Sequence, residues 1–397
     1  IIYDLIKFMN EQPKIILLLE TSRHLGREIL RGVADWSQRY GPVTLSATAG
    51  HFEQSLPDLR KEKNFGVISR LSVQGLVSSF KKYHFPLIVL EPVTSELLHL
   101  KEEFGLTEIR SDSETIGIMG ADYLLNDGFQ HFAFCGFPNR LWSRRRGDAF
   151  TEYLKQNNCQ CSVYPENEQE LSWEREQPKL KKWLQSLTKP VGLLACDDDR
   201  AHQILRLCGE ENIRVPQDIS VLGIGDDEIL CELAMPPLSS IAIDLFNAGF
   251  EATQTLVEQI NGKTERPNYI MMKPRWISSR QSTDFLAIND KLITNALQFI
   301  RKNYFRQINV NDVIKYLDTS RRTLELRFLA ARNHTVADEI KHYRLERAKR
   351  LLITCNDSIS SIAELSGFYN FRSMLRVFHQ TEHCTPTEFR EKHRHSD

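Results

Sequence analysis

The 397-residue chain is 41% hydrophobic and 26% charged, which fits two or three globular domains and excludes a disordered or fibrous chain. Its 51 Lys and Arg nearly balance its 52 Asp and Glu, but unevenly along the chain. From Lys291 to the end 19 basic side chains stand against 12 acidic ones, whereas residues 1–290 hold 32 basic and 40 acidic. A basic end on an acidic chain indicates an anionic partner there, although a basic solvated face would give the same counts.

Neither a membrane segment nor a metal site is expected. The aliphatic run Ile15–Leu19 has five residues, far fewer than the roughly 20 that span a bilayer, and the first dozen residues do not form a signal peptide. We therefore expect a cytoplasmic protein without a membrane partner. The eight cysteines include no C-x-x-C pair, and the close pair Cys159 and Cys161 has no further ligand at zinc spacing, so reduced structural thiols are expected.

Short aliphatic segments alternate with amphipathic segments up to about residue 260. Strands are predicted over 14–20, 65–69, 85–91, 131–137, 191–196 and 220–225. Helices are predicted over 115–126, 146–156, 200–211 and 247–259, and a further one follows the first strand and ends at Tyr40. Strands that alternate with helices pair in parallel through right-handed crossovers. The pattern therefore predicts a doubly wound α/β region.

Polar side chains follow these strands where each one ends. In open parallel sheets, ligands bind at the carboxyl ends of the strands. Carboxylates and guanidinium groups hydrogen-bond vicinal sugar hydroxyls, and an indole packs on the C–H face of the ring. An acidic residue before a helix can instead be its N-cap. The candidate sugar-binding residues are Arg23, Glu91, Trp142, Arg146, Asp197, Asp198 and Asp226.

Residues 14–280 resemble the effector domain of LacI-type repressors and periplasmic sugar-binding proteins. The segments that carry the resemblance include GREILRGVADWSQRYG, IRSDSETIGIMGADYLLNDGFQHFAFCG and, most specifically, RVPQDISVLGIGDD. The resemblance implies two α/β lobes that close on a sugar, with contacts from Arg23, Glu91, Arg146 and Asp197. Gly225 stands where the family has the aspartate of its G-F-D motif, so the resemblance supports Asp226 less than Asp197.

After a linker predicted over 281–290, residues 291–397 show helical periodicity throughout. Apolar residues repeat about 50 positions apart, as Val313, Ile314, Leu317, Leu324 and Phe328 and again as Ile359, Ile362, Ala363, Phe368, Met374 and Phe378. Ser320 and Asn370 are predicted to cap the second helix of each pair, which places arginines in its first turn. This placement is typical of a helix-turn-helix, whose second helix reads the major groove, although solvated surface arginines would look alike.

These helices resemble the DNA-binding domain of the arabinose-regulator (AraC) family through TSRRTLELRF, YRLERAKRLL, RVF and TPTEFR. The resemblance implies two helix-turn-helix units joined by one long helix. The implied DNA-binding residues are Arg321, Arg322, Glu325, Arg372, Ser373 and Arg376. Leu326 stands where the family often has Arg or Lys, so we expect the first unit to read fewer bases. Asn333 and His383 replace glycines that usually follow a helix, and both types tolerate the left-handed conformation.

The order of the two parts resembles that of the bacterial xylose operon activators over essentially the whole chain. The resemblance implies a homodimeric transcription activator that binds operator DNA, contacts RNA polymerase and responds to a monosaccharide, D-xylose, with no cofactor. There are two alternatives: an α/β enzyme with a metal held by Asp197, Asp198 and Asp199, and a transport-type binding protein. No phosphate-binding loop, nucleophile elbow or dinucleotide loop supports an enzyme, and the basic helical end argues against a transport protein.

Overall fold

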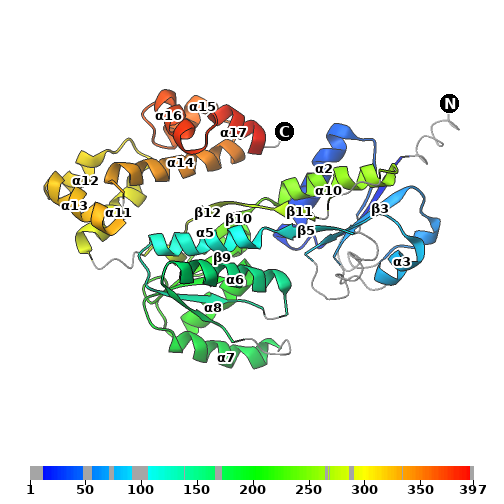
Figure 1. The fold of residues 1–397 in the computed structure, drawn as a ribbon, viewed down its shortest axis with the longest axis horizontal. Helices are drawn as coiled ribbons and strands as arrows, with labels where there is room; N and C mark the ends of the chain where they lie inside the picture. Colours follow the sequence, from blue (N-terminus) through cyan, green and yellow to red (C-terminus); the bar gives the residue numbers. More distant parts are fainter. Residues whose placement is uncertain are drawn as a thin grey trace. The chain divides into compact units, whose positions relative to one another are not determined.

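The computed structural model describes residues 12–47, 56–70, 76–91, 106–137, 139–165, 172–263, 267, 269–285, 290–332 and 334–393. The chain divides into two compact units. The first, residues 1–125 with 130–285, alternates strands and helices, and the second, residues 286–397 with the short segment 126–129, is helical (Figure 1). The predicted fold class, a two-lobed α/β domain followed by an all-helical domain, is confirmed.

The first lobe is built on a six-stranded parallel sheet. Its strand order is β11 (Tyr269–Met272), β5 (Thr107–Ser111), β4 (Leu87–Leu90), β3 (Phe65–Ser69), β1 (Lys14–Leu18) and β2 (Thr44–Ala47). Helices α2 (His24–Tyr40), α3 (Leu76–Tyr83) and α10 (Leu245–Ile260) and the short turn η2 (Leu59–Lys61) complete it. The central strands read as continuous aliphatic runs because both faces of such a sheet are buried.

The second lobe holds another six-stranded sheet. Its order is β12 (Pro274–Ser278), β10 (Ser239–Ile243), β9 (Ile219–Gly225), β8 (Val191–Ala195), β6 (His131–Cys135) and β7 (Gln160–Val163), with only β12 antiparallel. Its helices are α5 (Ser113–Asn126), α6 (Leu141–Gln156), α7 (Trp173–Ser186), α8 (Asp198–Glu210), α9 (Glu228–Leu233) and η3 (Gln281–Thr283).

The chain crosses between the lobes three times, at Asp112, Asp244 and Lys273, each between one element and the next. The crossings lie side by side, because the Asp112 N–H donates to the Met272 carbonyl at 3.0 Å and the Asp244 N–H donates to the Lys273 carbonyl at 2.8 Å. Three short, hydrogen-bonded segments form a hinge about which two rigid lobes can rotate.

The second unit contains seven helices in its described part. They are α11 (Lys291–Asn303), α12 (Val310–Leu317), α13 (Arg321–Arg332), α14 (Val336–Thr354), α15 (Ile359–Leu365), α16 (Phe371–Thr381) and α17 (Pro386–His393). One core forms around Val313, Leu324 and Phe328, and another around Ile362, Met374 and Phe378, while α14 contributes to both. The predicted repeat of a helical pair is therefore present. No described helix combines the length and apolar character that a bilayer span requires.

Parts of three sequence predictions fall outside the described residues. These parts are Asn333, positions 286–289 of the predicted linker, and the first few residues of the chain. Of the linker, residues 281–285 belong to the first unit, where Ser282 and Thr283 are buried.

Candidate functional site

Arg146, in α6 of the second lobe, lies at the first crossing between the lobes. Its side chain is buried; one terminal nitrogen donates to the Cys196 carbonyl at 2.6 Å and the other to the Ser111 hydroxyl at 3.0 Å. Its Nε has no hydrogen-bond partner among the described residues. A buried donor without an acceptor costs free energy, so this N–H still needs an acceptor that the described residues do not supply.

An aromatic wall stands beside this guanidinium. The centre of the Arg146 guanidinium lies 4.8 Å from the centroid of the Trp142 ring, which meets the Phe137 ring edge-on at a centroid distance of 6.4 Å. Both aromatic residues follow β6, at its carboxyl end. An aromatic face next to a hydrogen-bond donor is the combination that a sugar ring needs, because the ring has an apolar C–H face and a polar rim.

The first lobe contributes a charged group of its own. Arg23, just before α2, pairs with Glu20 at 3.2 Å and with Asp199 of the second lobe at 2.5 Å. Because this side chain is 56% exposed and Asp199 43% exposed, the ion pair between the lobes is accessible to water. A narrow gap at the end of β1, too small for a water molecule, is lined by Glu20, Arg23 and Arg70 together with Leu19, Leu25, Gly26 and Leu90.

Arg70 belongs to this group, although the sequence interpretation did not select it. Burial lowers the pKa of its guanidinium, and the carboxylates of Glu20 and Glu91 oppose that effect. Arg70 directly follows β3, so the signal that selected the other strand ends also applied to it. Ser111, likewise missed, lies at the end of β5, whose polar sequence TEIRS gave no strand signal.

Glu91 lies near the first crossing between the lobes, where its side chain binds the backbone of Ser111. Its carboxylate accepts the Ser111 N–H at 2.7 Å, and the residue adopts a left-handed φ of 40° with its side chain buried. Glu91 therefore fixes the position of Ser111, the residue that receives the Arg146 hydrogen bond. A direct sugar contact from Glu91 stays a prediction.

The three consecutive aspartates at the start of α8 point to different partners. Asp197 is the N-cap, since its carboxylate accepts the Arg200 N–H at 2.8 Å, and burial raises its pKa. Asp199 pairs with Arg23 across the lobes. Asp198 turns into the second lobe, where its oxygens accept the Ser240 hydroxyl at 2.6 Å and the Asp227 N–H at 2.9 Å. Within the described part of the chain, no cluster of three acidic, His or Cys side chains suits a metal ion.

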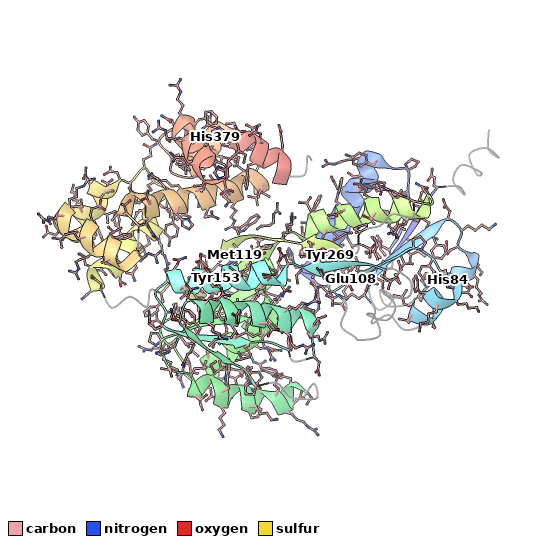
Figure 2. The ribbon with its side chains drawn as sticks, in the orientation of Figure 1. His84, Glu108, Met119, Tyr153, Tyr269 and His379 are labelled. Atoms are coloured by element: carbon pink, nitrogen blue, oxygen red, sulfur yellow. The ribbon has the colours of Figure 1, made fainter. Side chains whose placement is uncertain are left out.

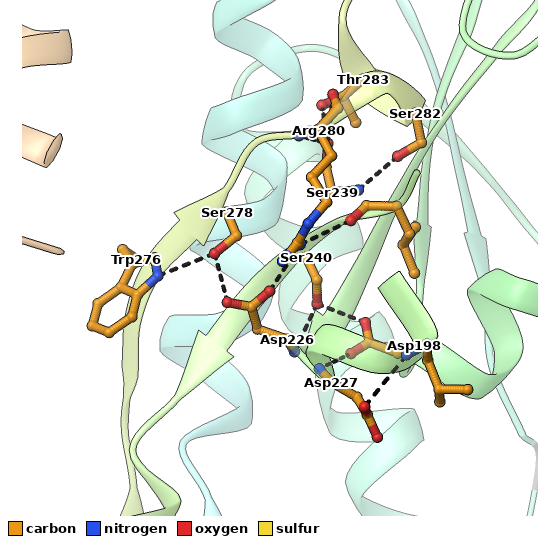
Figure 3. A network of polar contacts seen from close by, with 12 residues as sticks. Asp198, Asp226, Asp227, Ser239, Ser240, Trp276, Ser278, Arg280, Ser282 and Thr283 are labelled. Atoms are coloured by element: carbon orange, nitrogen blue, oxygen red, sulfur yellow. Dashed lines mark hydrogen bonds and ion pairs between the residues drawn. The ribbon is translucent and has the colours of Figure 1, made fainter. Parts of the chain in front are cut away.

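Asp226 belongs to the same internal network (Figure 3). Its carboxylate accepts from Arg280 at 2.8 Å and from the Ser278 hydroxyl at 2.5 Å, and its N–H donates to the Ser240 hydroxyl at 3.0 Å. Asp198 and Asp226 therefore tie the loop after β9 to β10 and β12. The sequence interpretation assigned both to the sugar; in the structure their carboxylates have partners inside the lobe, and a sugar contact from either residue stays a prediction.

In the second unit, α13 and α16 begin with the predicted caps. The Thr323 N–H donates to the Ser320 hydroxyl at 3.1 Å, and the Ser373 N–H donates to the Asn370 side chain at 2.9 Å. The Ser373 hydroxyl donates to the Asn370 carbonyl at 2.7 Å, so it takes part in the cap, and its contact with DNA stays a prediction.

The predicted arginines lie on the open faces of these two helices. Arg321 and Arg322 of α13 and Arg372 and Arg376 of α16 are all exposed, and Glu325 is half-buried. His379, also on α16, is exposed and marks that helix in Figure 2.

The turns inside the two helical pairs use left-handed residues. Asp318 ends α12 with a φ of 47°, and Gly367 follows α15 with a φ of 83°. A Cβ on Gly367 would lie 2.2 Å from the Tyr304 carbonyl oxygen, so only glycine fits there. His383, which replaces a family glycine, adopts a φ of 54°, in agreement with the prediction that it would tolerate this conformation.

Comparison with known proteins matches both units. Residues 121–283 fit the model of a periplasmic binding protein-like domain, and residues 313–392 fit that of a helix-turn-helix domain. The chain is 29% identical to the xylose operon regulatory protein of Haemophilus influenzae, over 96% of this chain and 99% of that protein. Identity to the corresponding protein of Escherichia coli K12 is 26%, over 96% and 98%. A solved structure of a xylose-binding transcription activator superposes with a TM-score of 0.58 at 26% identity, covering 97% of this chain and all of that one.

Proposed function

Because the chain belongs to the bacterial transcription regulators that join a periplasmic-binding-protein-like domain to an AraC-type helix-turn-helix domain, we propose that it activates a pentose-utilisation operon in response to D-xylose. It is a regulator and not an enzyme. The observation that carries the sugar assignment is Arg146, a buried guanidinium at the hinge whose Nε–H has no acceptor among the described residues.

In this proposal the sugar binds between the lobes, against Trp142 and Arg146 on one side and Arg23 and Arg70 on the other. A sugar oxygen accepts from the Arg146 Nε, and the C–H face of the ring packs on the indole. The bound sugar and the ion pair between Arg23 and Asp199 then hold the two lobes together. Closure is favoured only by the difference in sugar affinity between the closed and open forms.

The output of closure is a change in how the helix-turn-helix units meet DNA. A homodimer would present four reading helices, two of them α13 and two α16, to successive major grooves, which lie about 34 Å apart along one face of the duplex. Sugar and operator binding must then strengthen each other by the same factor, since coupling between two sites is reciprocal. Contact with RNA polymerase follows from the role of an activator.

The sugar assignment is tested by thermal unfolding of the full chain with D-xylose, L-arabinose, D-ribose, D-glucose and D-galactose. We expect D-xylose to raise the melting temperature most. Arg146→Ala should abolish this shift, because it removes the open donor and the link to Ser111 and Cys196. Arg145→Ala, which changes the exposed neighbour on the same helix, is the control and should keep the shift. A full shift in the Arg146 variant would remove that residue from the site, and a stronger response to another sugar would change the effector.

The DNA assignment is tested by two single substitutions on the reading helices. Arg372→Ala should cost about 1–3 kcal/mol of operator binding and relax the preference at one base pair, because its guanidinium is proposed to read a base edge. Arg321→Ala should weaken binding to DNA of every sequence by the same factor, as expected of a residue that contacts a phosphate. Binding of each variant to a panel of single-base operator changes separates the two roles, and identical profiles would contradict the assignment.

A further inference from the structure

The two reading helices present different chemistry on corresponding faces. Their caps, Ser320 and Asn370, and their buried residues, Leu324 with Phe328 and Met374 with Phe378, align when about 50 positions are added. In this register Arg322 corresponds to Arg372, but Leu326 corresponds to Arg376, Leu329 to His379 and Ala330 to Gln380. At these three positions α16 is therefore polar and α13 is apolar.

The leucines of α13 do not belong to the core. At about 100° per residue, Leu326 and Leu329 lie opposite the buried pair Leu324 and Phe328. Their exposed fractions are 59% and 48%, whereas Leu324 and Phe328 are fully buried. Ala330 on the same face is also exposed. Two large apolar side chains on one open helix face indicate a binding surface rather than packing within this unit.

Three observations favour DNA as the occupant of this face. Arg321 and Arg322 open the helix and are exposed, so the surface is basic where it would approach phosphates. The same helix is the second member of a helix-turn-helix. A leucine donates and accepts no hydrogen bond, and the base-edge feature of the major groove that suits it is the C5-methyl group of thymine.

We propose that Leu326 and Leu329 read thymine methyl groups, so that α13 selects an A·T-containing half of the operator while α16 selects guanine through Arg372 and Arg376. This inference rests on the proposed function, since it assumes that α13 lies in a major groove. In this view Leu326 determines specificity, whereas the sequence analysis expected its position only to lose a base contact.

The test uses the full chain and an operator duplex selected from random DNA. Each thymine is replaced in turn by deoxyuridine, which removes only the methyl group, and binding is measured for the wild type, for Leu326→Ala and for the control Leu365→Ala, which changes an exposed leucine on α15. We expect at least one thymine whose methyl group contributes about three- to fourfold in affinity for the wild type and the control. The same methyl group should contribute nothing for Leu326→Ala.

Two results would overturn the inference. One is a wild-type protein that binds the selected operator but is insensitive to every replacement, and the other is a Leu326→Ala variant that stays as sensitive as the wild type, as expected if this face binds a protein. Failure of the proposed function looks different, because the wild type would then select no sequence from random DNA. A circular-dichroism melt of each variant confirms that it is folded.

Discussion

At the scale of single residues, Asp198 shows how a strand-end carboxylate can serve the fold. It is buried, and burial raises its pKa to about 7 even though the Ser240 hydroxyl and the Asp227 N–H stabilise the charged form. The carboxylate also fills space that a side chain at Gly223 would occupy, since a Cβ there would lie 2.3 Å from its Oδ1. Asp198 therefore holds the loop after β9 in place, but keeping its charged carboxylate buried costs free energy, and this cost rises with pH.

We predict that Asp198→Asn makes stability less dependent on pH. Since the pKa is raised on folding, the folded state binds more protons than the unfolded state between about pH 4 and pH 7, and the free energy of unfolding falls as the pH rises through this window. An asparagine can accept the Asp227 N–H and donate to Ser240 without a charge. Urea unfolding at pH 5, 6, 7 and 8 checks this. Between pH 5 and pH 8 the free energy of unfolding of the variant, relative to that of the wild type, should rise by on the order of 2 kcal/mol. Parallel curves would contradict this account.

At the scale of elements, each helical pair depends on the conformation of one turn residue. Asp318 and Gly367 both have a left-handed φ, and the Cα of Gly367 lies close to the backbone of Tyr304 and Phe305. The turn of the second pair therefore touches the segment that follows α11. Arg347 of α14 stabilises this contact between the turn and the segment after α11. Its Nε donates to the Leu365 carbonyl at 2.8 Å, and its guanidinium lies 5.6 Å from the Phe305 ring centroid.

We predict that Gly367→Ala destabilises the helical unit by about 2–4 kcal/mol, because the added Cβ meets a backbone oxygen and the left-handed conformation penalises it. Operator affinity should fall with stability, while the sugar-induced thermal shift stays. Gly209→Ala is the matched control. Apart from its own helix, no described residue has an atom within 4 Å of a Cβ added at Gly209, so the helix should gain about 0.5–1 kcal/mol. Equal stability of the Gly367 variant and the wild type by guanidinium unfolding would contradict the prediction.

At the scale of the whole molecule, charge separates the two tasks of the chain. The basic residues concentrated after position 290 suit a polyanion, and the acidic remainder disfavours non-specific DNA binding by the sugar-binding lobes. A sugar carries no net charge, so its site needs hydrogen bonds and an aromatic face rather than a strong electrostatic potential.

This separation predicts that salt weakens binding of the operator but not binding of the sugar. Operator affinity should fall about a thousandfold between about 50 and 200 mM salt, because each phosphate contact releases condensed counterions. D-xylose affinity of the same protein should change little over that range. Fluorescence anisotropy for the operator and calorimetry for the sugar make the comparison in one buffer series, and a flat operator response would contradict the charge argument.

The sequence alone determined the α/β and all-helical parts, the repeated helical pair, the caps at Ser320 and Asn370 and the exposed arginines that follow them. These features are local, since they depend on periodicity and on the residue types that begin a helix. Only the tertiary structure decided which partner each strand-end side chain takes. Asp197, Asp198 and Asp226 looked like Arg146 in the sequence, but an acidic side chain takes whichever buried donor the fold brings to it, and here these are the Arg200 N–H, Ser240 and Arg280.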